Sequence, residues 1–247
     1  MNIEKGKLKR SETIENGYRA YYFEYGESAP IIEEELGPDT YEIAAYVEGS
    51  PFKDQTYLSN WLGNFFKERM IANDEIKNTV DKLLEGCSNE DEKIAALYRF
   101  LQDNIRYVSI KTSLSSGLAG HKAAETFANR YGDCIDKAIL FATMLQYAGV
   151  EAYPVIVMTN DNPQPLYDKL GVLNGNHAIN QIHLKNGKII HLDSTANCYR
   201  YPFFRSDDHG IIAWNPIKNT LQNTGFPDPK DEAITSELNI TLMKNGS

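Results

Sequence analysis

Cysteine is scarce in this sequence, and basic residues are outnumbered by acidic ones. The 247 residues include three cysteines, too few and odd in number for a disulfide framework, so at least one thiol is expected to be free. There are 25 Lys and Arg residues against 34 Asp and Glu residues, and the net charge is −9. Non-specific nucleic-acid binding needs a basic surface, so the composition argues against a nucleic acid as partner.

Long apolar runs are also missing. No run reaches the roughly 18–20 apolar residues that a membrane-spanning helix needs, so no membrane insertion is expected. The N-terminal stretch MNIEKGKLKRSETIENG lacks the apolar region of a signal peptide, so the chain as written is expected to be cytoplasmic. A fragment of an exported protein would instead belong to the periplasm or cell envelope. Gly-rich nucleotide loops and His-Glu-x-x-His are absent, and the sequence indicates no cofactor.

Three zones follow one another along the chain. Residues 1–54 alternate β-prone stretches such as Tyr18–Tyr25 with turns, and they either pack on the rest or are the remnant of a preceding β domain. Residues 55–150 carry apolar side chains at helical spacing, and strand-like segments return from 151 onward. This order predicts an α+β core over 55–225. Residues 226–247 are expected to be a linker and the first strand, SELNITLM, of a truncated following β domain.

Cys134 stands at the beginning of the most apolar helical segment. Gly132 and Asp133 mark the start of this segment, with Asp133 as the candidate N-cap, and Gly149 marks its end. The residues after Cys134 are apolar on nearly every side, which predicts a buried helix. The partial positive charge of a helix N-terminus favours a thiolate, as a nucleophile requires. The alternative is a buried cysteine that does no chemistry.

A nucleophilic thiol needs a general base and a group that orients this base. His177 and Asp193 lie on two β-like segments joined through Asn186-Gly187. A two-residue turn would place them on opposite faces of the hairpin. A three-residue turn, with Gly187 in the left-handed bulge position, pairs Ile179 with Asp193 and brings His177 and Asp193 to one face. A His–Asp dyad therefore requires the bulged turn.

Several segments together resemble the transglutaminase-like superfamily. They are Gly132-x-Cys134-x-x-x-Ala138-x-Leu140, YAGVEAYPVIV, NHAINQIHL and IIHLDST. The segments NIRYVSI and GDCIDKA are similar to those of bacterial transglutaminase-like proteins whose core is flanked by β domains. The resemblance covers residues 70–200. It implies a papain-like cysteine-peptidase fold, in which a helical N-terminal half contains the buried Cys-bearing helix and packs on an antiparallel sheet.

The resemblance also implies the roles of individual residues. Cys134 would be the nucleophile, His177 the base and Asp193 the orienting residue of a Cys-His-Asp triad. The implied reaction is thiol acyl transfer on amide or peptide carbonyls of a protein or peptide substrate, with hydrolysis favoured over cross-linking. Tyr107 and Tyr98 are the candidates for a side chain that stabilises the oxyanion.

The sequence departs from the family pattern at three positions beside the triad. These positions are Ile179 in place of a frequent Trp, Gln181 in place of Glu, and Ser194 in place of Pro. They leave the substrate preference open.

Two other interpretations stay open. One is a catalytically idle core that serves as a binding or scaffolding module between β domains. The other is a zinc site, because His183, His191 and Asp193 would share a hairpin face in the bulged register. The ordinary interpretation of the two histidines is that they are half-buried strand residues.

Overall fold

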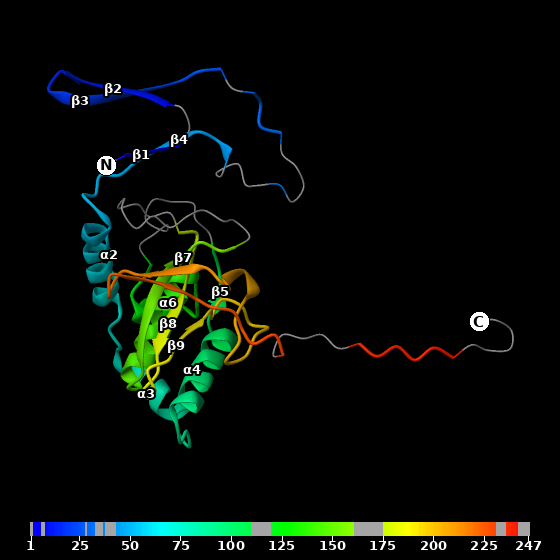
Figure 1. Ribbon diagram of the computed structural model, residues 1–247. Helices are drawn as coiled ribbons and strands as arrows, with labels where there is room; N and C mark the ends of the chain where they lie inside the picture. The colour runs from blue at the N-terminus through cyan, green and yellow to red at the C-terminus, as the bar shows by residue number, and fades with distance from the viewer. Residues whose placement is uncertain are drawn as a thin grey trace.

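The computed structural model describes residues 2–5, 8–27, 29–32, 37, 43–109, 120–160, 175–230 and 236–241. The helices of the described chain precede the strands of its largest sheet, as an α+β class requires (Figure 1). Among these residues, no helix has both the length and the apolar character that crossing a bilayer requires.

Short polar caps begin the first three of the principal helices. Within the described residues the principal helices are α2 Gln55–Arg69, α3 Asp74–Leu83, α4 Glu90–Asn104, α5 Ala123–Asn129 and α6 Cys134–Tyr147. The side chains of Asp54, Asn73 and Asn89 each accept a hydrogen bond from the backbone N–H three residues further on. These bonds satisfy N–H groups that a helix start would leave unpaired, which is why the helices begin there.

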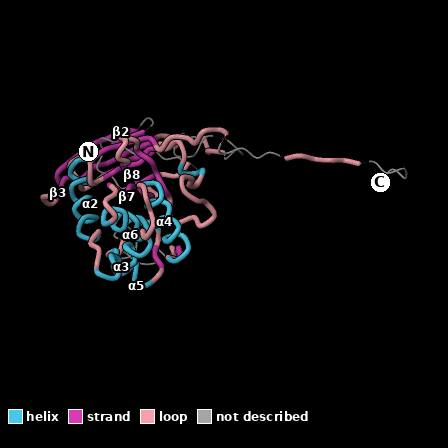
Figure 2. The backbone as a smooth tube through the Cα atoms, turned by 90° about the horizontal axis from the view of Figure 1, so that it is seen from below, coloured by secondary structure: helices cyan, strands magenta, loops and turns pink. Residues whose placement is uncertain are grey.

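Helix α6 is the centre of the fold. Every side chain from Cys134 to Leu145 is buried, as the mostly apolar sequence predicts, and the buried set includes Asp136 and Lys137. The helix contacts α3, α4 and α5 on one side and the strands β7 (Glu151–Val157) and β8 (His177–His183) on the other. Figure 2 shows the helices gathered on one side of β7 and β8. The cysteine at the start of α6 is therefore held between the helical layer and the sheet.

The main sheet has five strands in the order β11-β10-β7-β8-β9, and every neighbouring pair is antiparallel. The remaining strands are β9 Ile189–Leu192, β10 Ile212–Asn215 and β11 Thr220–Asn223. The face toward α6 carries part of the main core, including Ala178, Ile182 and Leu192. A smaller apolar cluster, which includes Val155 and Ile179, lies apart from this core. The sequence pattern did not indicate β10 and β11, each of which spans only four residues.

The hairpin between β8 and β9 has the three-residue turn. Its pairs include Asn180 with Leu192, and the Leu184 N–H donates to the Lys188 carbonyl at 2.8 Å. Gly187 has a φ of +85°, in the left-handed region that glycine adopts without strain. The bulged register is confirmed, so Asp193 lies on the same hairpin face as His177.

The N-terminal strands form two small sheets of their own. Strand β1 (Asn2–Lys5) pairs with β4 (Tyr46–Gly49), and β2 (Leu8–Glu15) pairs with β3 (Tyr18–Tyr25). Among the described residues, neither sheet is joined by backbone pairing to the five-stranded sheet.

The strand expected near the C-terminus is not present in its described part, residues 236–241. Leu238 and Ile240 are exposed there, and Figure 1 shows this segment leading away from the body of the molecule. An isolated segment leaves its backbone groups without partners, and β-prone composition alone does not hold it as a strand. The following β domain stays a prediction. Residues 242 and 243 of the predicted strand lie outside the described residues.

Candidate active site

The loop that carries the cysteine is held by short strands and by a capping box. Strands β5 (Arg106–Tyr107) and β6 (Tyr131–Gly132) pair in parallel. Asp133 accepts a hydrogen bond from the Asp136 N–H at 3.0 Å, and Asp136 accepts one from the Asp133 N–H at 3.1 Å. A Cβ at Gly132 would lie 2.5 Å from the Asp136 Cβ, so only glycine fits. Cys134 is thereby fixed as the first helical residue, as the N-cap prediction required.

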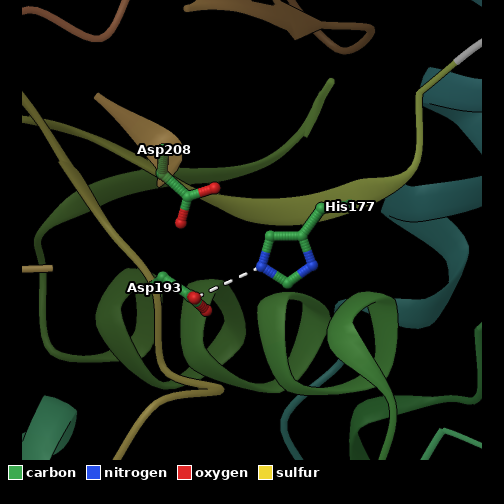
Figure 3. Close-up of side chains that lie close together, drawn as sticks. All are labelled: His177, Asp193 and Asp208. Atoms are coloured by element: carbon green, nitrogen blue, oxygen red, sulfur yellow. Dashed lines mark hydrogen bonds and ion pairs between the residues drawn. The ribbon is translucent and has the colours of Figure 1, made fainter. Parts of the chain in front are cut away.

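His177 and Asp193 form the predicted dyad. The His177 Nε2–H donates to Asp193 Oδ2 at 3.2 Å (Figure 3). Thr195 donates its backbone N–H to Asp193 Oδ1 at 2.8 Å and its hydroxyl to Oδ2 at 2.7 Å. Asp193 is fully buried, so these three donors compensate for its loss of hydration.

The Cys134 thiol completes a chain of contacts through the same imidazole. Burial alone would lower the pKa of His177, but hydrogen bonds with Asp193 and with Cys134 outweigh it and raise this pKa to about 10. Burial opposes ionisation of Asp193, and the bonds from His177 and Thr195 reverse this, so the pKa of Asp193 is lowered. At neutral pH the dyad is therefore an imidazolium–carboxylate pair close to the Cys134 sulfur.

The two tyrosines singled out for oxyanion stabilisation have different surroundings. Tyr107 pairs with Gly132 and is 41% exposed, and burial followed by the proximity of Cys134 raises its pKa. Tyr98 is buried, and its hydroxyl donates to the backbone carbonyl of Asp193 at 2.7 Å and approaches that of Phe203 at 3.2 Å. The only proton of the Tyr98 hydroxyl is thus already donated within the protein. Tyr98 is therefore not a suitable donor to an oxyanion. Tyr107 stays a candidate.

Asp208 is a member of this group that the sequence pattern did not indicate. It ends the short 3₁₀ turn η1 (Ser206–Asp208) and is fully buried. A nitrogen of His177 and one oxygen each of Asp193 and Asp208 lie within 4.8 Å of one another. Burial, and next the charge of Asp193, raise the pKa of Asp208 to about 7. The run Arg205 to Asp208 reads as a solvated loop, because four polar residues in succession have no periodicity.

The three residues of the alternative zinc site, His183, His191 and Asp193, are not brought together within the described part of the chain. The His183 Nε2–H donates to the amide oxygen of Gln181 at 3.0 Å, and the amide nitrogen of Gln181 lies 3.4 Å from His191 Nε2. Burial, together with the nearby His183, lowers the pKa of His191 to about 4. The alternative site is not formed because Gln181, directly opposite His191, lies between the two imidazoles and contacts both.

The group of His177, Asp193 and Asp208 has the residue types of a metal site. The bonds that His177 and Asp193 already make decide whether a metal ion could bind to them. His177 Nε2 and Asp193 Oδ2 are bonded to each other, and both Asp193 oxygens accept from Thr195. The His177 Nε2–H and both Asp193 oxygens are thus already engaged with protein groups, so we assign no metal to the group.

The family comparison matches the segment that contains these residues. Residues 77–194 match the model of the transglutaminase-like superfamily. This segment belongs to the transglutaminase-like superfamily. The transglutaminase-like core contains Cys134, His177 and Asp193, whereas Asp208 lies outside the matched residues. No curated protein matches the chain in sequence.

Three solved structures are similar to the chain. A candidate protease of Parabacteroides distasonis has a TM-score of 0.67 at 16% identity, and the match covers 89% of this chain and 41% of that one. A candidate cysteine protease of Cytophaga hutchinsonii has a TM-score of 0.38 at 19% identity, with 53% and 42% covered. The periplasmic domain of TgpA from Pseudomonas aeruginosa has a TM-score of 0.36 at 18% identity, with 55% and 48% covered.

These matches span less than half of each solved chain. The first match, at its low identity, shows the fold and not the activity. The transglutaminase-like, papain-like fold predicted for the core is confirmed.

Proposed function

We propose that the transglutaminase-like core catalyses thiol acyl transfer on amide or peptide carbonyls, with hydrolysis as the overall reaction. One observation carries this proposal: the buried imidazole of His177 is hydrogen-bonded to the Asp193 carboxylate and lies close enough to Cys134 for that residue to raise its pKa. This is the arrangement by which a base accepts a thiol proton while a carboxylate stabilises the resulting imidazolium.

The steps follow from the positions of the three side chains. In the reactive ion pair the proton of Cys134 already resides on His177, and the thiolate sulfur forms a bond to the substrate carbonyl carbon. The carbon–nitrogen bond then breaks, and the amine leaves with the proton from His177. Water attacks the thioester next, His177 takes a proton from this water, and the carboxylic acid leaves as the thiol is restored.

The developing oxyanion needs hydrogen-bond donors near the thiol. The backbone N–H of Cys134, at the N-terminus of α6, is one candidate donor because it has no intrahelical partner. Tyr107 is the candidate side-chain donor, since it lies beside Gly132 and interacts with Cys134. We favour water as the acceptor because it is always present, and a protein or peptide as the substrate.

The alkylation rates of the three cysteines test this proposal. Cys134 is 3% exposed, Cys87 is half-buried and Cys198 is exposed. Accessibility alone predicts that iodoacetamide reacts first with Cys198, whereas an activated thiol predicts Cys134. At pH 7 we expect Cys134 to react at least roughly tenfold faster than Cys198, as measured by mass spectrometry of the digested protein.

The matched variants separate activation from accessibility. His177→Ala should slow the reaction of Cys134 and leave that of Cys198 unchanged, and Cys134→Ser should abolish hydrolysis of a fluorogenic peptide library without loss of the folded state. A Cys134 that reacts more slowly than Cys198 in the unaltered protein would contradict the proposed activity.

A catalytically idle binding module is the second candidate function. It is favoured by the low exposure of Cys134 and His177, at 3% and 8%, which limits access of a substrate to the described site. Slow alkylation of Cys134, together with no turnover of any peptide in the library, would support this alternative.

We also propose that the N-terminal strands belong to a β domain that is more extensive than the described sheets. The hairpin of β2 and β3 exposes Tyr18, Tyr22 and Ile14, although two-stranded sheets rarely hold together alone. Apolar side chains on such a hairpin are ordinarily covered by further strands.

A further inference from the structure

Asp208 is a buried carboxyl group that the proposed mechanism leaves without a task. Its side chain has no solvent exposure, and neither oxygen has a hydrogen-bond partner among the described residues. Burying an acid without partners is unfavourable, so its presence beside a catalytic group calls for an explanation.

The backbone around Asp208 aims the side chain at the dyad. The Asp208 N–H donates to the Arg205 carbonyl at 3.2 Å, and the Thr224 hydroxyl donates to the Asp208 carbonyl at 2.7 Å. With its backbone held on both sides, the side chain lies on the same side of the His177 ring as Asp193 in the view of Figure 3, with the two carboxyl groups one above the other.

The charged and titratable groups around Asp208 come from four elements. Asp193 follows β9, His177 begins β8, Asp207 and Arg205 lie at η1, and the Tyr98 hydroxyl comes from α4. Arg205 is paired with Asp207 through two contacts, so its charge is largely compensated locally. The imidazolium of His177 is therefore the cation available to an ionised Asp208.

We propose that Asp208 is a positioning residue whose negative charge helps to hold His177 as an imidazolium, and so extends the active form of the Cys134–His177–Asp193 unit to higher pH. This inference rests on the proposed function and deepens it. Asp193 orients the ring through a hydrogen bond, whereas Asp208 acts through charge alone.

The effect of Asp208 depends on pH. The pKa of Asp208, raised to about 7 by burial and by the charge of Asp193, places its ionisation below that of His177, whose pKa is raised to about 10. Below pH 7, Asp208 is neutral and Asp193 supports the imidazolium by itself. Above pH 7, a second negative charge faces the ring in the range where His177 would begin to lose its proton.

The experiment is an NMR titration of the His177 ring in the full chain, with and without Asp208→Asn. Asparagine keeps the size and planarity of the side chain and cannot ionise. We expect the titration midpoint of His177 to fall by about one pH unit in this variant. The alkaline limb of peptide hydrolysis should move by a similar amount, because His177 must carry a proton to the leaving amine.

Asp207→Asn is the matched control, because it removes the same charge from the adjacent residue of η1. Asp207 is paired with Arg205, so this variant should shift the His177 midpoint far less than Asp208→Asn. Equal shifts in the two variants, or an unchanged midpoint in Asp208→Asn, would overturn the proposal.

The unaltered protein provides a measurement that does not depend on the folding of a variant. The His177 ring signals should show a second inflection near pH 7, where Asp208 ionises. Its absence would also overturn the inference. A midpoint shift without any hydrolysis would support the role of Asp208 while contradicting the proposed activity, so the two failures are distinguishable.

Discussion

At the scale of single residues, the dyad concentrates opposite charges where water is excluded. Asp193 is fully buried and His177 is 8% exposed, so the separation of 3.2 Å between them is screened very little. Tyr98 adds a neutral support, because its hydroxyl bonds to the backbone carbonyl of Asp193. Asp193 is therefore held in position through bonds to its side-chain carboxylate and to its backbone carbonyl.

Removal of the Asp193 carboxylate charge is expected to lower the free energy of unfolding, by an amount that depends on pH. His177 has a folded pKa raised to about 10, above its ordinary value near 6.5, so the folded state binds more protons between these values. The stabilisation is therefore fully present below about pH 6.5 and is lost as the pH rises toward 10. Asp193→Asn should lower the free energy of unfolding by about 3 kcal/mol at pH 6.

Urea unfolding at a series of pH values checks this prediction. The difference between the unaltered protein and Asp193→Asn should shrink steadily as the pH is raised from about 6.5 to 10. Asp103→Asn, which alters an exposed acid paired with Arg99 and Arg200, serves as the control and should show no such trend. A difference that stays constant with pH would show that the dyad is not an ion pair.

At the scale of elements, the candidate site depends on one turn. The three-residue turn between β8 and β9 sets the register, and a slip of one residue would turn every side chain of β9 to the other face of the sheet. Asp193 would then point away from His177. Gly187 supports this turn because its φ of +85° is unfavourable for residues with a Cβ.

Substitutions at Gly187 separate backbone strain from steric conflict. No atom lies within 4 Å of a Cβ built at this position, so only the backbone conformation resists a side chain. Gly187→Val should lower the free energy of unfolding by about 1–2 kcal/mol, and Gly187→Asn by clearly less, since Asn tolerates the left-handed region. Urea unfolding of both variants measures the difference, and equal losses would contradict this account of the turn.

Much of the candidate site could be predicted from the local sequence. The rest depends on contacts between residues far apart in the chain, which the spacing of residue types in the sequence does not indicate. The Asn186-Gly187 pair narrowed the hairpin to two registers, and Asp133 marked the helix start because an N-cap is a local feature. Asp208 could not be found in this way, since it reaches the dyad from a turn with no periodic pattern. Tyr98 was assigned the wrong task because its contact with Asp193 spans 95 positions and depends on the packing of α4.

At the scale of the whole molecule, the core and the N-terminal strands differ in how they are held. The core has a continuous apolar interior from α2 through α6 to the main sheet. The hairpin of β2 and β3 buries no side chain fully, and its backbone pairs only within itself among the described residues. Phe52, which lies between β4 and α2, does contact the core: it packs against Trp61 of α2 with ring centroids 5.8 Å apart.

These differences predict that removal of residues 1–49 leaves the core folded. A loss of about 1 kcal/mol would lower the melting temperature by 2–4 °C in a protein of this size, and we expect less than that. Removal of residues 1–54 also deletes Phe52 and the N-cap Asp54, and should lower the melting temperature by a further 2–4 °C. Calorimetry of both shortened chains measures these values. A decrease well above 5 °C on removal of 1–49 would instead show that the N-terminal sheets pack onto the core and are part of its cooperative unit.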